Sequence, residues 1–313
     1  MTKWKVLVTD GLTKKGLAIL NEAAQVDNTP DITPEDLLKV AGEYDAMVVR
    51  GRTKVTAAVF EAAKKLKVVG RAGVGVDNID LTAASAHNVR VVNAPKSTSL
   101  AVAELAIGMM FALARHIPYA DATMKAGKWE KKKLEGIELN GKTLGVIGMG
   151  NIGSAVAQRA AALGMDVIGY DPAIAADEIQ KRGAKPVTLA DLYANSDFIT
   201  LHIPLKPETK NMLNGEAFAQ MKTGVRIIDA ARGGIIDETA LLGALESGQV
   251  AAAALDVFAT EPPGLSALVA HPKVVATPHI GAQSAEAQDR AAEDIASEVL
   301  NALQGVPLRW KIV

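Results

Sequence analysis

The sequence predicts an α/β protein with two doubly wound parallel-sheet domains. Short runs of β-branched residues alternate along the chain with alanine-rich stretches that have helical periodicity. This alternation falls into two series, one that ends near Pro95 and one that begins after it. Strands that alternate with helices form parallel sheets joined by right-handed crossovers. Two such series therefore predict two sheets.

Each expected element is a short segment between polar or glycine-containing turns. In the first series we expect a helix near residues 13–23 and strands at residues 5–9, 46–49, 68–70 and 89–93. A long helix over residues 100–115 and a polar segment at residues 127–133 come next. In the second series we expect a helix at residues 152–163 and strands at residues 143–147, 166–170, 198–201, 226–229, 252–257 and 274–277.

One amphipathic helix, residues 285–303, follows the second series. A helix with a single apolar face must cover another apolar surface. We expect it to return to the first domain and make that domain discontinuous. The expected domains are thus residues 1–96 plus 285–313, and residues 97–284.

The composition narrows the function. The 313 residues include 34 Lys+Arg and 35 Asp+Glu, a net charge of -1, which argues against nucleic acid as the main partner. The absence of cysteine excludes disulfides and thiolate metal sites, and we expect no metal. The longest apolar stretch, residues 105–114, is too short to span a bilayer, so we expect no membrane partner. The start has no apolar leader, and we expect a cytoplasmic address.

The segment GMGNIG, residues 148–153, fits the pattern G-x-G-x-x-G between an expected strand and an expected helix. Gly148 permits the tight turn, Gly150 lets a pyrophosphate approach the backbone, and Gly153 lets the helix pack on the strand. The helix N-terminus, which begins at Asn151 and Ile152, supplies free N–H groups and partial positive charge. The pattern predicts a dinucleotide-binding domain of the Rossmann type.

Asp171 ends the next expected strand, 23 residues after Gly148. A carboxylate at this position accepts hydrogen bonds from the adenosine ribose hydroxyls. It would repel a 2′-phosphate, and the following Pro172 and Ala173 offer no arginine to offset it. The sequence therefore favours NAD over NADP.

Three polar residues follow three expected strands of the second sheet. Arg232 follows residues 226–229, Glu261 follows residues 252–257, and His279 follows residues 274–277. Ligands bind outside the carboxyl ends of strands in such sheets. Arginine binds a carboxylate with two parallel hydrogen bonds, and histidine exchanges protons near neutral pH. A glutamate can fix the tautomer of the imidazole. The three suit hydride transfer from a 2-hydroxy acid.

At these motifs the sequence resembles the D-isomer-specific 2-hydroxyacid dehydrogenase family. The resemblance covers nearly all of the chain and rests on GMGNIG, on DFITLHIPL at residues 197–205, on DAARGG at residues 229–234, on LDVF at residues 255–258 with Glu261, and on TPHIG at residues 277–281. It implies a Rossmann domain inserted into a flavodoxin-like substrate domain, and a homodimer through the NAD-binding domain. Arg232, Glu261 and His279 match the family's substrate arginine, histidine-orienting acid and acid/base.

The same resemblance implies further cofactor contacts. Asp256 would contact the nicotinamide carboxamide. Other residues would line the cofactor, namely His202, Ile203, Ala230, Ala231, Gly281 and Ala282.

The N-terminal half most resembles family members that act on a phosphorylated acid. The resemblance lies in VVRGRTKV at residues 48–55, GRAGVGVDNID at residues 70–80 and KAGKWEKKK at residues 125–133. Arg50 and Arg52 are placed to supply positive charge, and the turn at Val74 and Gly75 offers N–H groups for the substrate carboxylate. Lys131, by resemblance alone, would reach the phosphate across a dimer. We therefore expect NAD-dependent oxidation of D-3-phosphoglycerate to 3-phosphohydroxypyruvate, the first step of the phosphorylated serine pathway.

Two alternatives remain open. A glyoxylate or hydroxypyruvate reductase would share the whole cofactor half, and Arg50 and the lysines at 131–133 would then be a structural ion pair and a solvated face. A non-catalytic NAD-sensing corepressor would keep the same three polar residues. The sequence ends soon after the helix at residues 285–303, so we expect no C-terminal regulatory domain and no inhibition by serine.

Overall fold

The computed structural model describes residues 4–313. Residues 1–3 lie outside the described part. They belong to the N-terminal segment from which the absence of an apolar leader was expected. The chain divides into two compact units: unit 1 is Met1–Ser99 with Ala282–Val313, and unit 2 is Leu100–Gly281. The boundaries expected from the sequence, after residue 96 and before residue 285, each lie three residues from the observed ones.

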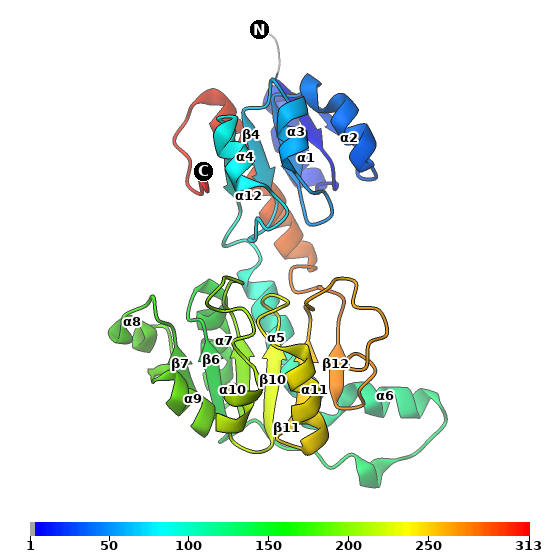
Figure 1. Ribbon diagram of the computed structural model, residues 1–313, viewed down its shortest axis with the longest axis vertical. Helices are drawn as coiled ribbons and strands as arrows, with labels where there is room; N and C mark the ends of the chain where they lie inside the picture. Colours follow the sequence, from blue (N-terminus) through cyan, green and yellow to red (C-terminus); the bar gives the residue numbers. More distant parts are fainter. Residues whose placement is uncertain (1–3) are drawn as a thin grey trace. The chain divides into compact units, whose positions relative to one another are not determined.

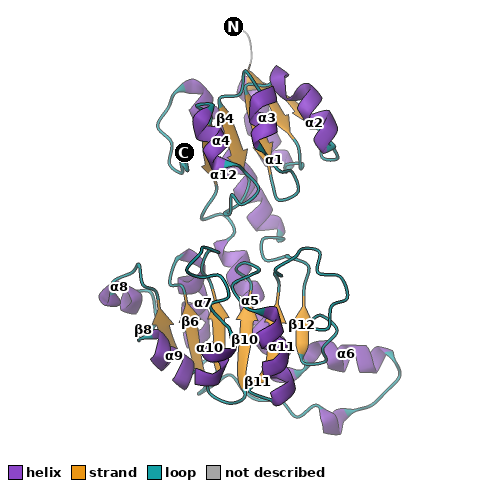
Figure 2. Ribbon diagram, in the orientation of Figure 1, coloured by secondary structure: helices purple, strands orange, loops and turns teal. Residues whose placement is uncertain are grey.

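Unit 1 is a five-stranded parallel sheet in the order β2-β1-β3-β4-β5, with helices on both faces (Figures 1 and 2). This is the strand order of flavodoxin-like folds, which bind ligands where the order reverses, beside β1 and β3. Its elements are β1 (Trp4–Val8), α1 (Lys14–Ala23), β2 (Ala24–Asn28), α2 (Pro34–Val40), η1 (Ala41–Glu43), β3 (Ala46–Val49), α3 (Ala57–Ala62), β4 (Val68–Arg71), α4 (Leu81–Ala86), β5 (Arg90–Asn93) and α12 (Ala285–Gln304).

Side chains that alternate along the strands of unit 1 feed two hydrophobic clusters. In β1, Val6 and Val8 belong to the cluster under α1 and α12, whereas Leu7 belongs to the cluster under α2, α3 and α4. All three side chains are fully buried. Burial on both faces explains why these strands are continuous apolar runs in the sequence.

Helix α12 packs against α1 and β4, so the first unit is discontinuous in sequence. Gly70 in β4 makes room for it, because a Cβ at that position would meet Val299 and Ile295 of the helix. Glu298 lies fully buried on α12, and its carboxylate accepts hydrogen bonds from the N–H groups of Arg309 and Trp310 at 2.9 and 3.2 Å. These bonds hold the C-terminal segment against unit 1.

Unit 2 is a seven-stranded parallel sheet in the order β12-β11-β10-β9-β6-β7-β8. The order reverses between β6 and β9, as in dinucleotide-binding folds. Its elements are α5 (Ser99–Arg115), α6 (Ile117–Lys125), η2 (Lys131–Lys133), β6 (Thr143–Ile147), α7 (Asn151–Ala162), β7 (Asp166–Tyr170), α8 (Ala176–Lys181), β8 (Lys185–Pro186), α9 (Leu189–Asn195), β9 (Phe198–Leu201), α10 (Gly215–Gln220), β10 (Val225–Asp229), α11 (Glu238–Ser247), β11 (Val250–Leu255) and β12 (Val274–Ala276).

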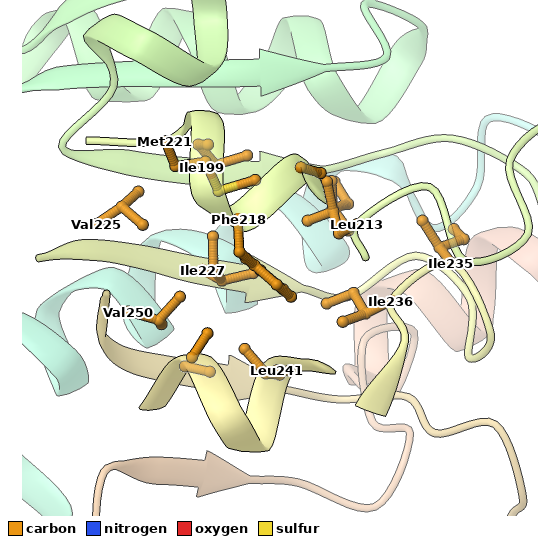
Figure 3. Packing of buried hydrophobic residues seen from close by; sticks show 14 of the residues in the cluster. Ile199, Leu213, Phe218, Met221, Val225, Ile227, Ile235, Ile236, Leu241 and Val250 are labelled. Atoms are coloured by element: carbon orange, nitrogen blue, oxygen red, sulfur yellow. The ribbon is translucent and has the colours of Figure 1, made fainter. Parts of the chain in front are cut away.

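The core of unit 2 also has two layers, one on each face of the sheet. Figure 3 shows part of the layer under α10 and α11, where Phe218 lies among Ile227, Leu213 and Leu241. The other layer contains buried residues of α5 and α7, among them Met110. The core therefore fixes the carboxyl ends of β6, β9, β10 and β11, which carry the predicted site residues.

The structure contains elements that were not individually expected from the sequence. These are the short edge strands β2 and β8, the helices α2, α3, α4, α6, α8, α9, α10 and α11, and the short helices η1 and η2. Strand β11 begins two residues earlier than expected and ends two earlier, and the other expected strands and helices match within one residue at each end. In β2 the sequence AQVDN offers only two apolar residues, Ala24 and Val26, and only Ala24 is fully buried, so the strand gives a weak signal in the sequence.

Within residues 4–313, no single helix is both long and apolar enough to cross a membrane. Helices α5 and α6 meet those criteria only as a pair, with a bend of 65° between them.

Candidate active site

The phosphate loop in unit 2 connects β6 to α7. Gly148 has a φ of +94°, which favours glycine, and a Cβ at Gly153 would collide with the carbonyl oxygen of Gly148. Gly150 is the N-cap of α7 and has no side-chain cap. In the described chain, the N–H groups of Gly150, Asn151 and Ile152 have no hydrogen-bond partner. Open N–H groups at the start of a 12-residue helix fit a pyrophosphate.

Two side chains hold the loop at Met149. Asp171 Oδ2 accepts a hydrogen bond from Met149 N at 2.9 Å, and Arg182 Nη1 donates one to Met149 O at 2.8 Å. Asp171 Oδ1 accepts from Ala173 N at 2.9 Å. Asp171 thus lies at the loop with one backbone partner on each oxygen, which leaves lone pairs for ribose hydroxyls. Sequence reasoning missed Arg182, because only the fold brings the end of α8 to this loop.

We expect Gly153→Ala to weaken NADH binding by about a hundredfold or more, roughly 2.7 kcal/mol, because the new methyl group would push α7 away from Gly148. Isothermal titration calorimetry measures this directly. Gly243→Ala is the matched control, since a Cβ there, inside α11, would meet no atom within 4 Å. An unchanged dissociation constant in Gly153→Ala would show that the loop tolerates the shift.

His202 and Ile203 follow β9 beside this loop. A Cβ at Gly148 would collide with the carbonyl of His202 and would lie 2.7 Å from Ile203 Cγ2. His202 is half-buried, and burial lowers the pKa of its imidazole to about 3. Its Nε2 lies 3.0 Å from Thr200 Oγ1, and its Nδ1 has no hydrogen-bond partner among the described residues. His202 is thus uncharged at neutral pH, packs beside the phosphate loop and cannot act as an acid there.

His279 and Glu261 meet, as the sequence predicted. His279 Nδ1 lies 2.8 Å from Glu261 Oε2, and Glu261 Oε1 accepts a hydrogen bond from Phe258 N at 3.1 Å. Because a carboxylate can only accept, Nδ1 carries the hydrogen in this contact, and in the neutral ring the lone pair is then on Nε2. Both side chains are partly exposed, at 49% for His279 and 38% for Glu261. The imidazole is therefore oriented and open to a substrate.

The backbone of His279 is strained, with a φ of +54° that few non-glycine residues adopt. Asp256, which is 1% exposed, holds this turn. Its carboxylate accepts hydrogen bonds from the N–H groups of Ile280 and Gly281, both at 2.8 Å, and from Thr277 Oγ1 at 2.6 Å. The structure therefore gives Asp256 the role of holding the His279 turn, and its expected contact with nicotinamide stays a prediction.

Arg232 lies in the turn that follows β10. The turn packs closely against the next strand end, because a Cβ at Gly233 would collide with the carbonyl of Phe258. Arg232 Nη1 donates a hydrogen bond to Ala231 O at 2.7 Å. Ala230 and Ala231, which were expected to line the cofactor, are each 8% exposed. The close approach of Gly233 to Phe258 thus places the Arg232 turn beside the segment that carries Glu261.

Asp229 is a buried acid at the base of this turn, and its Oδ1 accepts a hydrogen bond from Ala231 N at 2.8 Å. Burial raises its pKa to about 7, with a further rise from the charge of Asp256. The N–H groups of Ala231 and Arg232 and the Arg232 charge oppose this rise. Asp229 does not stand out in the sequence, because its burial depends on how distant segments pack around it.

The raised pKa of Asp229 makes stability depend on pH. Between about pH 4 and pH 7 the folded state holds this proton and the unfolded state releases it, so stability falls as the pH rises through that range. We expect Asp229→Asn to remove the effect. The quantity to follow is the free energy of unfolding of Asp229→Asn minus that of the unsubstituted protein. In urea titrations this difference should rise by about 1–3 kcal/mol from pH 5 to pH 8.

Asp197→Asn is the control, because Lys222 and the N–H of Thr143 lower the pKa of Asp197 on balance against its burial. Its contribution is already complete at pH 5, so the difference it makes should be flat over the same range. A flat Asp229→Asn difference would mean that Asp229 is ionised throughout.

The predicted substrate residues of unit 1 follow β3 and β4. Arg50 N and Arg50 O are both hydrogen-bonded, to Asp10 Oδ2 at 2.7 Å and to Asn78 Nδ2 at 3.0 Å. Its half-buried guanidinium has no partner in the described chain. The N–H groups of Val74 and Gly75 also lack partners among the described residues. These groups match what an anionic ligand needs.

Arg52 differs from the expectation that it supplies charge to a substrate. Its guanidinium donates hydrogen bonds to three carbonyls, those of Thr9 and Pro30 at 2.6 Å and of Ile32 at 2.9 Å. It also lies 3.2 Å from Asp10 Oδ1. Four oxygen partners hold its guanidinium against the loops of unit 1, and its expected contact with a substrate stays a prediction.

Lys131 begins the short helix η2 and is exposed, with no ion-pair partner in the described residues. Its neighbour Lys133 pairs with Glu130 at 3.1 Å, and Glu130 also accepts a hydrogen bond from Tyr119 at 2.6 Å.

Of the last two residues expected to line the cofactor, Ala282 falls in unit 1 and Gly281 in unit 2. No group of three or more His, Asp or Glu that could hold a metal occurs in residues 4–313.

Comparison with known proteins places this geometry in a family. A family model described as "D-isomer specific 2-hydroxyacid dehydrogenase, NAD binding domain" matches residues 107–281, more than half of the chain. The chain belongs to this family. NAD is thus the dinucleotide for the phosphate loop of unit 2, and the three polar residues that follow its strands occupy the carboxyl edge of the NAD-binding sheet.

Individual members of the family align over nearly the whole chain. "D-3-phosphoglycerate dehydrogenase 2, chloroplastic" of Arabidopsis thaliana is 50% identical over 307 residues, which are 97% of this chain and 49% of that protein. The chain spans about half the length of the curated relatives it matches.

Solved structures of the family share the fold from end to end. The TT0316 protein from Thermus thermophilus is 34% identical with a TM-score of 0.89, over 99% of this chain and 100% of that one. A glyoxylate reductase from Paecilomyes thermophila is 31% identical with a TM-score of 0.90, over 100% of this chain and 99% of that one.

Proposed function

We propose that the chain oxidises D-3-phosphoglycerate to 3-phosphohydroxypyruvate with NAD. The observation that carries the reaction is the His279–Glu261 contact of 2.8 Å, which leaves Nε2 as a base. The name of the Arabidopsis relative supports the substrate. The guanidinium of Arg50, which has no partner among residues 4–313, supplies the charge that a phosphorylated acid requires.

The chemistry follows from these groups. Arg232 binds the substrate carboxylate, which fixes the position of the neighbouring C2. His279 Nε2 removes the proton of the C2 hydroxyl, and Glu261 stabilises the imidazolium that forms. NAD, when bound, supplies the hydride acceptor. The C2–H bond breaks with its electron pair leaving as hydride, and the C2–O bond becomes a carbonyl.

Initial rates at 340 nm with NAD or NADH test the substrate. The panel is 3-phosphoglycerate, phosphohydroxypyruvate, hydroxypyruvate, glyoxylate and 2-oxoglutarate. We expect the phosphorylated pair to lead by about a hundredfold in kcat/KM, or about 2.7 kcal/mol. A lead for glyoxylate or hydroxypyruvate would favour the reductase, the second candidate, which the similarity to the Paecilomyes enzyme supports. No turnover on any member would favour the corepressor.

We also propose that the chain is a homodimer through an arm of unit 2, defined as residues 117–136. Figure 1 shows the segment of α6 and η2 reaching away from the sheet of unit 2. The arm exposes large apolar side chains, namely Ile117 at 52%, Tyr119 at 46%, Met124 at 55% and Trp129 at 79%. Several exposed large apolar side chains within one short segment are typical of protein interfaces. In such a dimer Lys131 would reach a substrate phosphate of the other copy.

Sedimentation velocity tests the dimer. We expect the unsubstituted chain to sediment as a dimer, and Ile117→Lys with Met124→Lys to sediment as a monomer, because two lysines cannot be buried unpaired in an interface. Leu265→Lys is the control, since Leu265 is 86% exposed and lies outside the arm. A dimer that survives the double substitution would place the interface elsewhere.

A further inference from the structure

Residues 50–53 form the loop after β3, and two polar side chains from distant parts of unit 1 hold it. Asp10 follows β1, which is the neighbour of β3 in the sheet. Asn78 lies between β4 and α4. The loop therefore sits at the point where the strand order of unit 1 reverses.

Asp10 binds the loop through both carboxylate oxygens, and its side chain is only 4% exposed. Oδ2 accepts hydrogen bonds from Arg50 N at 2.7 Å and from Thr53 N at 3.1 Å. Oδ1 accepts from Thr53 Oγ1. Asn78 Nδ2 donates to Arg50 O at 3.0 Å and to Thr53 O at 2.6 Å. The two ends of the loop are thus bound on both backbone polar groups.

Within this cluster, the negative charge of Asp10 is balanced by Arg52 and not by the guanidinium of Arg50. Asp10 lies 3.2 Å from Arg52 Nη2, so its negative charge already has a cationic partner. The guanidinium of Arg50 has no partner in the described chain, although its own backbone is bound to Asp10. Arg52 thus offsets the charge of the carboxylate that binds the Arg50 backbone.

We propose that Asp10 and Asn78 are positioning residues that hold the 50–53 loop so that Arg50 meets the anionic end of the substrate, with Arg52 as the counter-charge of Asp10. This inference rests on the proposed function of Arg50. It gives Arg52 a role beside Arg50 that requires no contact with the substrate.

The test is Asp10→Asn in the full-length protein, which keeps the volume of the side chain but loses one acceptor oxygen and the charge. We expect the KM for 3-phosphoglycerate to rise about tenfold with kcat nearly retained, because binding is lost equally in ground and transition states. The dissociation constant of NADH should stay unchanged. In an Arg50→Ala background the same substitution should add less than about twofold.

Asp45→Asn is the matched control. Asp45 performs a similar task at the opposite end of the same sheet, where Oδ2 accepts from Lys5 N at 3.0 Å and Oδ1 lies 3.2 Å from Lys67 Nζ. It should lower stability without raising KM. An unchanged KM in Asp10→Asn, or an equal rise in the Arg50→Ala background, would overturn the proposal.

Amide hydrogen exchange separates this proposal from the proposed function, since it needs no turnover. In Asp10→Asn we expect the amides of Arg50 and Thr53 to exchange at least about tenfold faster, and the amide of Lys5 to be unaffected. If the unsubstituted protein does not act on 3-phosphoglycerate, the proposed function fails while faster exchange still supports the positioning role of Asp10. Unchanged exchange at Arg50 and Thr53 would overturn that role whatever the substrate.

Discussion

Replacing His279 with glutamine should lower kcat by about 10²–10⁴-fold, equivalent to roughly 3–5 kcal/mol in the barrier. Glutamine can still hydrogen-bond to Glu261, from which His279 Nδ1 lies 2.8 Å, but it cannot accept the hydroxyl proton of the substrate. NADH affinity should stay the same, because the phosphate loop lies on other elements of unit 2. Stopped-flow single-turnover rates with calorimetric NADH binding measure both quantities.

His271→Gln is the matched control for this experiment. His271 lies before β12, and its Nδ1 accepts a hydrogen bond from Lys273 N at 3.2 Å. It has no role in the proposed chemistry, so kcat should be unchanged. Retention of more than about a tenth of kcat in His279→Gln would remove the acid/base role from His279.

Replacing Arg232 with alanine should lower kcat/KM by about 10³-fold, roughly 4 kcal/mol, because the substrate carboxylate would lose its bidentate partner. Arg232→Lys should recover only part of the loss, since an ammonium cannot reproduce the planar fork of the guanidinium. Steady-state rates over a range of substrate concentrations separate KM from kcat.

Arg226→Lys is the control on the same strand. Arg226 lies on β10, three residues before its end, with its guanidinium 5.5 Å from the ring of Phe198. The control should alter stability and leave kcat/KM nearly intact. If Arg232→Lys equalled the unsubstituted protein, a simple point charge would suffice and the bidentate argument would be wrong.

Much of the fold was predictable because its determinants are local in sequence. The strands at the centres of both sheets are buried on both faces, so they stand out as apolar runs between turns. The phosphate loop was predictable for a similar reason, since its glycines, strand and helix are contiguous. The contact between His279 and Glu261 followed from placing both residues after neighbouring strands of one sheet.

The remaining features depend on contacts between distant segments. The sequence places Arg52 beside Arg50 and gives no sign that the carbonyls of residues 9, 30 and 32 converge on its guanidinium. Asp10 and Arg182 lie in no recognisable motif, and the segment GRAGVGVDNID that contains Asn78 gives no sign of what Asn78 binds. Each of the three acts on a loop that is remote in sequence. A polar residue that serves such a loop can be recognised only when the fold has brought its partners together.

The return of α12 to unit 1 has a consequence for the order in which a newly made chain folds. On the ribosome, unit 2 and its 182 residues, Leu100–Gly281, emerge between the first strands of unit 1 and the helix that covers them. At about 5–20 residues per second this takes roughly 10–40 s. During that time the valines of β1, β3 and β4 in this cluster lack the cover that α12 supplies, and α1 is the helix already present on that face. Unit 2, whose residues are continuous, can complete its fold first, and the nascent sheet of unit 1 is the segment on which a chaperone would act.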